Sequence, residues 1–565
     1  MGGSSLRRLN ARLVTVGVLL VLAWGGIGYR LVVVQALEAD VYADHGLDQR
    51  LQREILAADR GTIFDRDGRE LAVTVDSVTF YANPSEIEDP TTVARLLAPL
   101  LHQNMLDVLD AISGEGTFAY VARQLERDDA DRVIAARLPG IYYFTEPKRV
   151  YPMGELTGHV IGFVQADDNQ GLEGLEYQYD DSLSGVPGEL LVERDPHGRT
   201  IPQGEYQVVP AEPGSDLVLT IKTEIQFAAA EALQRAIDRT GAKGGSIVVV
   251  DPATGEILAM VNLPTFDPND RSDADPAAFR NRAVTDVFEP GSTQKVITIS
   301  AALEAGIADP DTIFEIPTTI ERGETVFRDS TTHPSELTVT GIVAHSSNLG
   351  TITLGEMLGA KELHRNLYAF GLGQPSGVDF PGEASGLLRP SEEWCAVNCV
   401  ASTSIGYGVS VTTLQMAMVY ATVANDGVWV QPHLVKEIVD GKGTRVAVEP
   451  LQRRVIDAAT ALSMRLMLEE VVSGGTGGYA AVAGYRVGGK TGTTEKYLID
   501  EQRYSEDDVV ASFIGMGPID EPRVVVAVVL DSPRQDDSGG KGAAPVFAEV
   551  ALAALHQLGV PPDDR

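Results

Sequence analysis

The architecture of this chain can be inferred outward from one segment, Val287-Phe-Glu-Pro-Gly-Ser-Thr-Gln-Lys-Val-Ile-Thr-Ile-Ser-Ala-Ala-Leu-Glu304. Pro290 and Gly291 end a loop and an apolar run follows, so Ser292 is predicted to stand at the start of a helix. A separation of three residues places Ser292 and Lys295 on one face of that helix. This pair predicts a serine nucleophile whose proton is removed by a lysine.

Lys295 can accept a proton only if its own amine is neutral. Burial and a nearby cation both lower the pKa of a lysine, and Lys490 is the candidate cation. Backbone N–H groups at the start of the helix can stabilise a developing oxyanion. These requirements predict an acyl-transfer site that brings distant segments together.

The segment Lys490-Thr491-Gly492-Thr493 precedes an apolar run at residues 509–515 and is predicted to be an edge strand of a sheet. An extended peptide substrate can pair with such a strand. Gly492 would let the substrate backbone approach closely. The ammonium group of Lys490 and the hydroxyls of Thr491 and Thr493 suit a terminal carboxylate.

Between these segments lies Ser346-Ser-Asn348. Ser346 is the candidate proton relay to a leaving amine, and Asn348 is the candidate holder of a substrate amide. A helix-capping Ser/Asn cluster is the structural alternative. His345 adjoins Ser346, but neighbours on a helix do not face each other, so His345 is predicted to be an ordinary histidine.

Two further motifs compete with this interpretation. A second Ser-x-x-Lys, Ser538-Gly-Gly-Lys541, lies among glycines, where no helix is predicted to align its side chains. Gly484-Tyr-Arg-Val-Gly-Gly-Lys-Thr491 fits the expression for a phosphate-binding loop, which must lead from a strand into a helix. The residues that follow have poor helix propensity, so an ATPase is a distant alternative.

Composition excludes other classes of function. The chain has 565 residues and a formal net charge of −35, which argues against a nucleic-acid partner. Its two cysteines, Cys395 and Cys399, occur without clustered histidines, so neither a zinc site nor any other metal site is predicted. A disulfide between them remains open, because an oxidising compartment permits it but the short spacing constrains its geometry.

The apolar N-terminal segment predicts a membrane anchor at residues 13–35, although a cleaved signal peptide has similar features. Arginines precede this segment at positions 7, 8 and 12, so residues 1–12 are predicted to be a cytoplasmic tail. The rest of the chain would be extracytoplasmic, as a domain at residues 36–212 and a second at residues 213–565.

Local patterns predict an α+β fold for these two domains. Asp67-Gly68 is the predicted turn of a hairpin, and residues 91–138 show helical spacing. The second domain is predicted to contain a hairpin at residues 245–261, strands near 509–516 and 524–531, and a closing helix at 545–557.

Taken together, the chain resembles the class B penicillin-binding proteins, and most of all their division-specific, FtsI-like branch. The three motifs carry this resemblance. Further matching segments lie along nearly the whole chain: Arg60-Gly-Thr-Ile-Phe-Asp-Arg66, Tyr151-Pro152, Gly158-His-Val-Ile-Gly-Phe163, Gly171-Leu-Glu-Gly-Leu-Glu176, Arg280-Asn-Arg-Ala-Val-Thr-Asp-Val-Phe-Glu-Pro-Gly-Ser292, Gly406-Tyr-Gly-Val-Ser-Val-Thr412 and Ala544-Pro-Val-Phe547.

The resemblance implies an elongated α+β pedestal and a penicillin-binding transpeptidase domain with an antiparallel sheet flanked by helices. It implies that Ser292 attacks the D-Ala-D-Ala bond of a peptidoglycan stem peptide, releases D-Ala and passes the acyl group to an amine of a neighbouring stem. Penicillin would trap Ser292 as an ester, and the N–H groups of Ser292 and Thr493 would hold the oxyanion. No cofactor is implied.

The implied location is the bacterial inner membrane at the division septum, with the catalytic domain in the periplasm. The implied partners are an FtsW-type glycosyltransferase and other divisome membrane proteins. An elongation-specific transpeptidase is the alternative within the family. A D,D-carboxypeptidase or β-lactam hydrolase, which passes the acyl group to water, and a non-catalytic penicillin sensor or scaffold are alternatives of other classes.

Overall fold

The computed structural model describes residues 3–42, 50–193, 201, 206–498 and 503–563. These residues form two compact units. The smaller unit combines Met1–Asp59 with Gly185–Pro213, and the larger unit combines Arg60–Ser184 with Gly214–Arg565. The chain therefore leaves the smaller unit and returns to it once.

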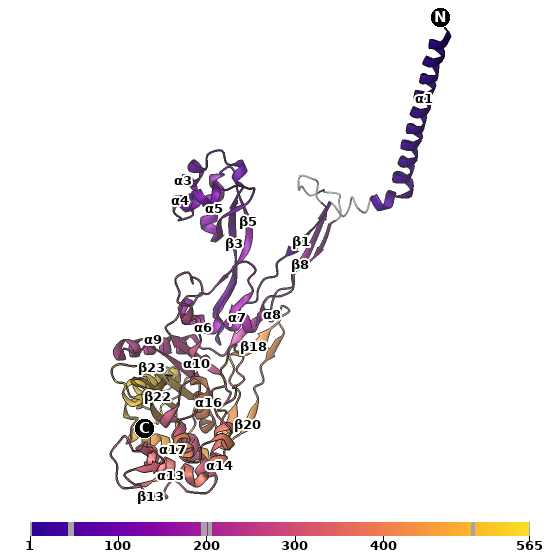
Figure 1. Cartoon of the computed structure of the whole chain (residues 1–565). Coiled ribbons are helices and arrows are strands. Elements are labelled where there is room, and N and C mark those ends of the chain that lie inside the picture. Colours follow the sequence, from indigo (N-terminus) through magenta and orange to yellow (C-terminus); the bar gives the residue numbers. More distant parts are fainter. Residues whose placement is uncertain (1–2, 43–49, 194–200, 202–205, 499–502, 564–565) are drawn as a thin grey trace. The chain divides into compact units, whose positions relative to one another are not determined.

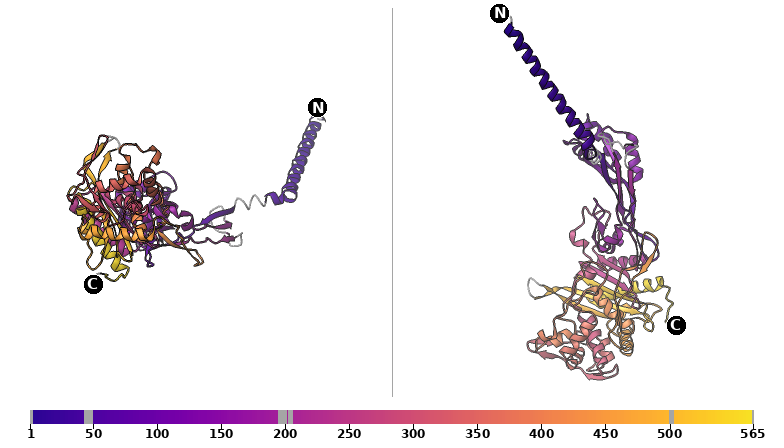
Figure 2. Two further views of the ribbon diagram at one scale, coloured as in Figure 1. Left: turned by 90° about the horizontal axis from the view of Figure 1, so that it is seen from below. Right: turned by 90° about the vertical axis from the view of Figure 1, so that its right-hand side faces the viewer.

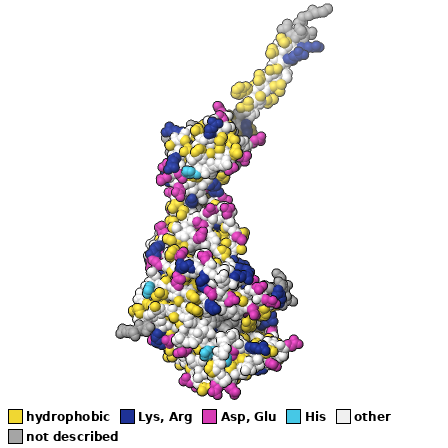
Figure 3. Space-filling model, turned by 90° about the vertical axis from the view of Figure 1, so that its left-hand side faces the viewer, with side chains coloured by type: hydrophobic (Ala, Val, Ile, Leu, Met, Phe, Trp, Pro, Cys, Tyr) yellow, Lys and Arg dark blue, Asp and Glu magenta, His cyan; other side chains and the backbone are white. Residues whose placement is uncertain are grey.

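The smaller unit begins with a long exposed helix, α1 (Gly3–Val32), which continues into the π-helical turn Val33–Leu37. The segment Arg7–Leu37 is long and apolar enough to cross a membrane, and Figure 3 shows hydrophobic side chains along it. The helix starts within the tail predicted at residues 1–12. A three-stranded antiparallel sheet completes this unit, in the order β1 (Leu51–Leu56), β8 (Gly188–Glu193) and β9 (Tyr206–Val209).

The larger unit contains a seven-stranded sheet whose strands come from three separate parts of the sequence (Figure 1). Its strands are β2 (Ile63–Phe64), β3 (Glu70–Ala82), β4 (Ala119–Leu125), β5 (Ile141–Val150), β10 (Asp216–Leu219), β18 (Val435–Val439) and β19 (Arg445–Ala447). β10 runs parallel to β2, and the other pairs are antiparallel.

The predicted turn between β2 and β3 is confirmed. Gly68 has φ 86°, a backbone conformation that favours glycine. The buried carboxylate of Asp65 accepts the backbone N–H groups of Asp67 and Arg69, at 2.9 Å each. This carboxylate also accepts the hydroxyl of Thr223 at 2.6 Å, so the turn is fastened to the start of the next domain.

The helical prediction for residues 91–138 is correct only in part. Helices α3 (Pro90–Leu100), α4 (Met105–Ile112) and α5 (Arg127–Ala136) share a core with β3. Between α4 and α5 the chain forms β4, which pairs with β3 and places Tyr120 opposite Tyr81. Pairing with a strand distant in sequence has outweighed the local helical pattern, as tertiary context often does.

A cluster of buried charges joins β5 of this sheet, through Arg149, to α7, through Glu176. Glu176 is completely buried and accepts one hydrogen bond from Arg60 and one from Arg149, each at 2.7 Å. Arg60 also pairs with Asp180 at 2.7 Å. Both guanidinium groups are nearly inaccessible to solvent, so each buried charge has a partner of opposite sign.

The remaining part of the larger unit is built on a five-stranded antiparallel sheet in the order β12–β11–β23–β22–β21. The strands are β11 (Gly244–Val250), β12 (Ile257–Leu263), β21 (Gly488–Leu498), β22 (Arg503–Gly517) and β23 (Val524–Asp531). The predicted hairpin and the two predicted C-terminal strands are therefore confirmed. β21 is an edge strand, also as predicted.

Helices cover both faces of this sheet, and Figure 2 shows its C-terminal strands in orange and yellow. Side chains alternate along each strand: Ile247 and Val249 of β11 join one core, whereas Val248 and Val250 join the other. The first core includes α9 (Thr223–Thr240) and the predicted closing helix, α18 (Ala544–Gln557). The second includes α11 (Lys295–Glu304), α13 (Asn348–Leu358), α16 (Thr413–Ala424) and α17 (Ala458–Ser473).

Shorter elements connect these layers. Cys395 and Cys399 form a disulfide at the start of α15. Their spacing alone had left this pairing open. The shorter helices are α6 (Gly158–Ile161), α7 (Gly174–Gln178), α8 (Asp180–Leu183), α10 (Arg282–Thr285), α12 (Val339–Ala344), α14 (Ala360–Ala369) and α15 (Cys399–Ser404). The paired short strands are β6 (Phe163–Val164) with β7 (Gly171–Glu173), β13 (Ile313–Glu315) with β16 (Glu336–Thr338), β14 (Ile320–Arg322) with β15 (Thr325–Phe327), and β17 (Val428–Val430) with β20 (Gln452–Arg454).

Candidate active site

The structure brings the first two predicted motifs into direct contact. Lys295 Nζ donates hydrogen bonds to Ser346 O and to Asn348 Oδ1, both at 2.6 Å, and lies 3.3 Å from Ser346 Oγ. Lys295 is 1% exposed, at the first turn of α11. Its amine therefore faces uncharged oxygen atoms of the second motif.

Ser292 lies in the 3₁₀ turn Gly291–Gln294 that leads into α11, and it is half-buried. The turn is held from two sides. Gly291 N donates to Gly406 O at 3.1 Å, and a Cβ on Gly406 would lie only 2.2 Å from Gly291 O. The buried hydroxyl of Tyr420 donates to Thr293 O at 2.9 Å. The backbone of the candidate nucleophile is thus fixed by its neighbours.

Both lysines of the site have lowered pKa values. Burial lowers the pKa of Lys295 well below its usual value, and the charge of Lys490 lowers it further, whereas Asp329 acts in the opposite direction. Burial lowers the pKa of Lys490 to about 7. These directions agree with the sequence-based argument, because a neutral Lys295 can accept a proton.

The second motif depends on a residue that the sequence analysis missed, Asp329. Asp329 accepts the backbone N–H groups of Asn348 and Leu349, the latter at 3.1 Å. It also accepts the hydroxyl of Ser347 at 2.8 Å, and its carboxylate lies 2.7 Å from His333 Nε2. No local signal marks Asp329, because it lies in an irregular loop upstream of the motif.

These contacts set the shape of the turn between α12 and α13. Ser347 caps α13, since its hydroxyl accepts Gly350 N at 3.0 Å. The capping alternative is thus correct for Ser347, while Ser346 has φ 58° and faces Lys295. Asn348 Nδ2 donates to Arg328 O at 2.8 Å. Both ends of this amide are therefore engaged within the chain, and the predicted contact of Asn348 with a substrate amide stays a prediction.

The third motif lies on β21, beside the nucleophile turn. Lys490 is completely buried, and its Nζ lies 3.3 Å from Thr491 O. A Cβ on Gly492 would lie 2.5 Å from Ser512 Oγ and 2.9 Å from Thr293 Cγ2. The close approach at this glycine is therefore made by the chain itself, and the predicted approach of a substrate is not its only reason.

The second Ser-x-x-Lys motif lies against the same strand. Gly539–Ala543 forms a short π-helical turn, and no side-chain contact between Ser538 and Lys541 is found among the described residues. Ser538 Oγ caps this turn, and Gly539 N donates to Thr493 Oγ1 at 3.0 Å. A Cβ on Gly539 would lie 2.4 Å from Gly492 O, so this segment supports β21 through its lack of side chains.

Two alternatives can now be compared with the geometry. Lys490 lies inside a continuous strand, Gly488–Leu498, whereas a phosphate-binding loop must lead into a helix. The structure therefore contradicts the ATPase interpretation. Among the residues that the structure describes, no group of three or more His, Cys, Asp or Glu side chains could hold a metal ion.

Comparison with known proteins assigns both parts of the chain to domains of penicillin-binding proteins. Residues 245–552 match the family model described as the penicillin binding protein transpeptidase domain, and residues 55–219 match the penicillin-binding protein dimerisation domain. The chain therefore belongs to the class B penicillin-binding proteins, the class that the fold and the three motifs define.

Its relatives extend over nearly the full length. A probable peptidoglycan D,D-transpeptidase, PenA of Neisseria meningitidis, is 36% identical over 98% of this chain and 94% of that protein. The peptidoglycan D,D-transpeptidase FtsI of Escherichia coli is 35% identical over 94% of this chain and 90% of that protein. The crystal structure of penicillin-binding protein 3 from Mycobacterium tuberculosis, complexed with aztreonam, has a TM-score of 0.71 at 32% identity, covering 90% of this chain and 98% of that one.

Proposed function

We propose that this protein is a peptidoglycan D,D-transpeptidase that works through an acyl-serine intermediate on Ser292. The observation that carries the proposal is the burial of Lys295 among uncharged acceptors at the start of the helix that follows Ser292. In this mechanism neutral Lys295 takes the proton as Ser292 Oγ attacks the carbonyl carbon. Ser346, within 3.3 Å of Lys295 Nζ, returns a proton to the departing amine.

The proposed donor is a stem peptide that ends in D-Ala-D-Ala. It would pair with the free edge of β21, and its terminal carboxylate would meet Lys490, Thr491 and Thr493. The exposed position of Thr493 on this strand supports this arrangement. The N–H groups of Ser292 and Thr493 would bind the oxyanion, because preorganised donors stabilise charge that develops in the transition state. The released amine is D-Ala, and a neighbouring stem then supplies the amine that takes the acyl group.

The proposed location is the inner membrane at the division septum. Residues 13–35 would span the membrane and residues 1–12 would face the cytoplasm, while a pedestal at 36–212 carries a periplasmic transpeptidase domain at 213–565. The apolar helix at Arg7–Leu37 and the FtsI relative support this location. The corresponding partners are an FtsW-type glycosyltransferase and other divisome proteins, and an elongation-specific role is the alternative.

The test is intact-mass spectrometry of the full chain in detergent after incubation with benzylpenicillin. We expect one stable adduct on the wild-type protein and none on Ser292→Ala, with both proteins folded. Labelling of Ser292→Ala would remove Ser292 as the nucleophile. A rapidly lost wild-type adduct would indicate a hydrolase instead of a transpeptidase.

A further inference from the structure

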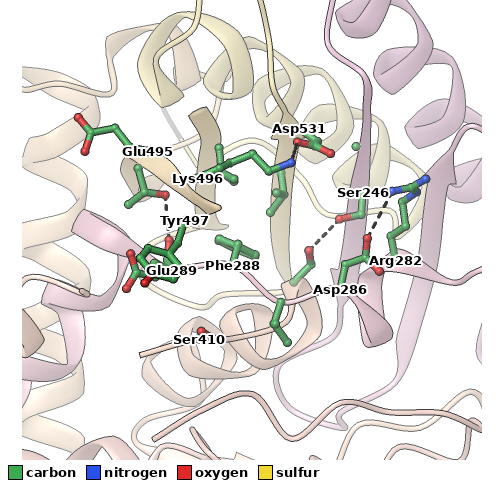
Figure 4. A pocket seen from close by; sticks show the side chains of 16 residues that line it. Ser246, Arg282, Asp286, Phe288, Glu289, Ser410, Glu495, Lys496, Tyr497 and Asp531 are labelled. Atoms are coloured by element: carbon green, nitrogen blue, oxygen red, sulfur yellow. Dashed lines mark hydrogen bonds and ion pairs between the residues drawn. The ribbon is translucent and has the colours of Figure 1, made fainter. Parts of the chain in front are cut away.

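A cavity of about 230 Å³ adjoins the nucleophile turn. It lies between the loop just before Ser292 and the part of β21 just after Thr493 (Figure 4). Most charges in its wall are paired: Lys496 with Asp531 at 2.5 Å, and Arg282 with Asp286 at 3.3 Å.

Two acidic residues of this wall, Glu289 and Glu495, form no such ion pair among the described residues, and Glu289 is the nearer to Ser292 in the sequence. Its Oε1 accepts Gly408 N at 2.7 Å. Burial raises the pKa of its carboxyl group, whereas Gly408 N and the nearby Tyr504 hydroxyl act in the opposite direction. Its Oε2 is buried yet accepts no hydrogen bond from any residue that the structure describes. No Lys or Arg in the described part of the chain forms an ion pair with it. A buried acceptor without a donor is destabilising unless a donor is supplied from elsewhere.

Three tyrosine rings lie around this carboxylate. Tyr504 is edge-on to Tyr497, with ring centres 5.2 Å apart, and edge-on to Tyr407, at 6.1 Å. Tyr497 lines the cavity together with Glu495, a second acidic residue. The faces of aromatic rings carry negative partial charge and attract cations. A carboxylate that has no ion-pair partner among the described residues and lies beside such rings would therefore bind an alkylammonium group.

We propose that Glu289 and these tyrosines form a subsite for an alkylammonium group of a stem peptide, beside the acyl-serine. This proposal rests on the proposed function. Glu289 precedes Ser292 by three residues, so their Cα atoms are at most about 11 Å apart. Thr494 Oγ1 donates to Glu289 O at 2.9 Å, which ties the subsite to the strand that receives the substrate.

The ammonium group can come from either of two sources in a transpeptidation. It can be the side-chain amine of the acyl donor, in which case the subsite selects the peptide that acylates Ser292. It can also be the amine of the acceptor, in which case the subsite holds the group that attacks the acyl-enzyme. The chemistry of recognition is the same, and the two sources affect different steps.

The donor arm of the test uses two thiolester substrates that differ only in whether a side-chain amine is free or acetylated. If the donor supplies the group, the wild-type full chain should prefer the free amine in kcat/KM by about tenfold or more. Glu289→Gln should remove most of this preference.

The acceptor arm forms the acyl-enzyme from the acetylated thiolester and adds Nα-acetyl-L-lysine amide. The ratio of aminolysis to hydrolysis is then measured. If the acceptor supplies the group, this ratio should fall about tenfold or more in Glu289→Gln. An effect in either arm supports the subsite and identifies the source, whereas unchanged ratios in both arms overturn it.

Matched variants separate charge recognition from folding. Glu521→Gln removes the same charge from an exposed bend that follows β22, at the other end of this strand from Tyr504. This variant should behave as wild type in both arms. Tyr504→Phe retains the ring and should keep the preference, whereas Tyr504→Leu should weaken it. If Tyr504→Leu and Tyr504→Phe show the same preference for the free amine, the ring has no role in the subsite. This comparison holds even if Glu289→Gln fails to fold.

Benzylpenicillin distinguishes failure of this proposal from failure of the proposed function, because its phenylacetyl side chain carries no ammonium group. If the wild-type chain forms the Ser292 adduct but both ratios are insensitive to Glu289→Gln, only the subsite is wrong. If no Ser292-dependent adduct forms, the proposed function is wrong.

Discussion

Two clusters of buried charge in the larger unit differ in whether each charge has a partner of opposite sign. Near the seven-stranded sheet, the carboxylate of Glu176 forms ion pairs with Arg60 and with Arg149, each at 2.7 Å. At the candidate active site, Lys295 and Lys490 are as deeply buried, but the hydrogen bonds of both amines go to uncharged oxygens. The positive charges of the first cluster are balanced by carboxylates, whereas the two lysines of the second cluster have no carboxylate among these hydrogen-bond partners.

The difference shows how burial serves two purposes. Removing one member of a balanced, buried cluster leaves a charge without a partner, so the cluster locks the local structure. A buried lysine without a carboxylate partner loses its proton more readily, which is unfavourable for stability but useful for a base. Burial alone therefore does not identify a functional residue, whereas burial without charge balance does.

The largest expected effect is on catalysis, from Lys295→Met. This variant keeps the apolar stem but lacks the amine, so acylation by a fluorescent penicillin should slow by about 10²–10⁴-fold. Lys295→Arg should be similarly slow because a guanidinium group stays charged. The midpoint temperature of thermal unfolding of Lys295→Met should equal or exceed that of the wild-type protein. Acylation of either variant at the wild-type rate would contradict the role of Lys295 as base.

The balanced cluster should respond in the opposite way. Glu176→Gln leaves two buried guanidinium groups with too little negative charge, and it should lower the free energy of unfolding by about 3–5 kcal/mol. Urea unfolding measures this loss, with the exposed neighbour Asp181→Asn as control. The acylation rate per folded molecule should not change. A loss no larger than that of the control would mean that the cluster does not stabilise this part of the larger unit.

The unbalanced cluster also predicts a pH dependence of stability. Burial lowers the pKa of Lys490 from 10.5 to about 7 in the folded state. Between these values the unfolded chain binds more protons than the folded chain, so the stability of wild type should rise with pH relative to Lys490→Met. Below the lower value both states are protonated, and the difference should be constant. Urea midpoints of the two proteins across this window test it, and parallel profiles would contradict it.

The smallest effect is expected for charges that are paired but exposed. Arg235 on α9 forms an ion pair with Glu549 on α18, and both side chains are about half exposed. Because solvent and salt screen such pairs, Arg235→Gln should change the free energy of unfolding by less than about 1 kcal/mol. A loss as large as that of Glu176→Gln would show that exposure does not separate these classes of charge.

The sequence was sufficient for the parts of the fold and the site that local patterns encode. The apolar runs predicted the hairpin β11–β12 and the edge strand β21, and the first two motifs predicted that Lys295 and Ser346 lie together. Asp329 and Gly539 escaped prediction, because each acts through contacts with residues that are distant in the chain. The pairing of Arg60 with Glu176, 116 residues apart, is of the same kind. Segment patterns determine helices and strands, whereas tertiary packing selects the partners.

The seven-stranded sheet has a consequence for how the chain is made. β10, at Asp216–Leu219, lies between β2 and β18, and β18 begins only at Val435. Because synthesis starts at the N-terminus, the growing chain has an unpaired edge of β10 until the distant β18 has been made. Open edges of this kind invite pairing with other chains. The edge of β10 is therefore open to incorrect pairing for as long as β18 has not been made.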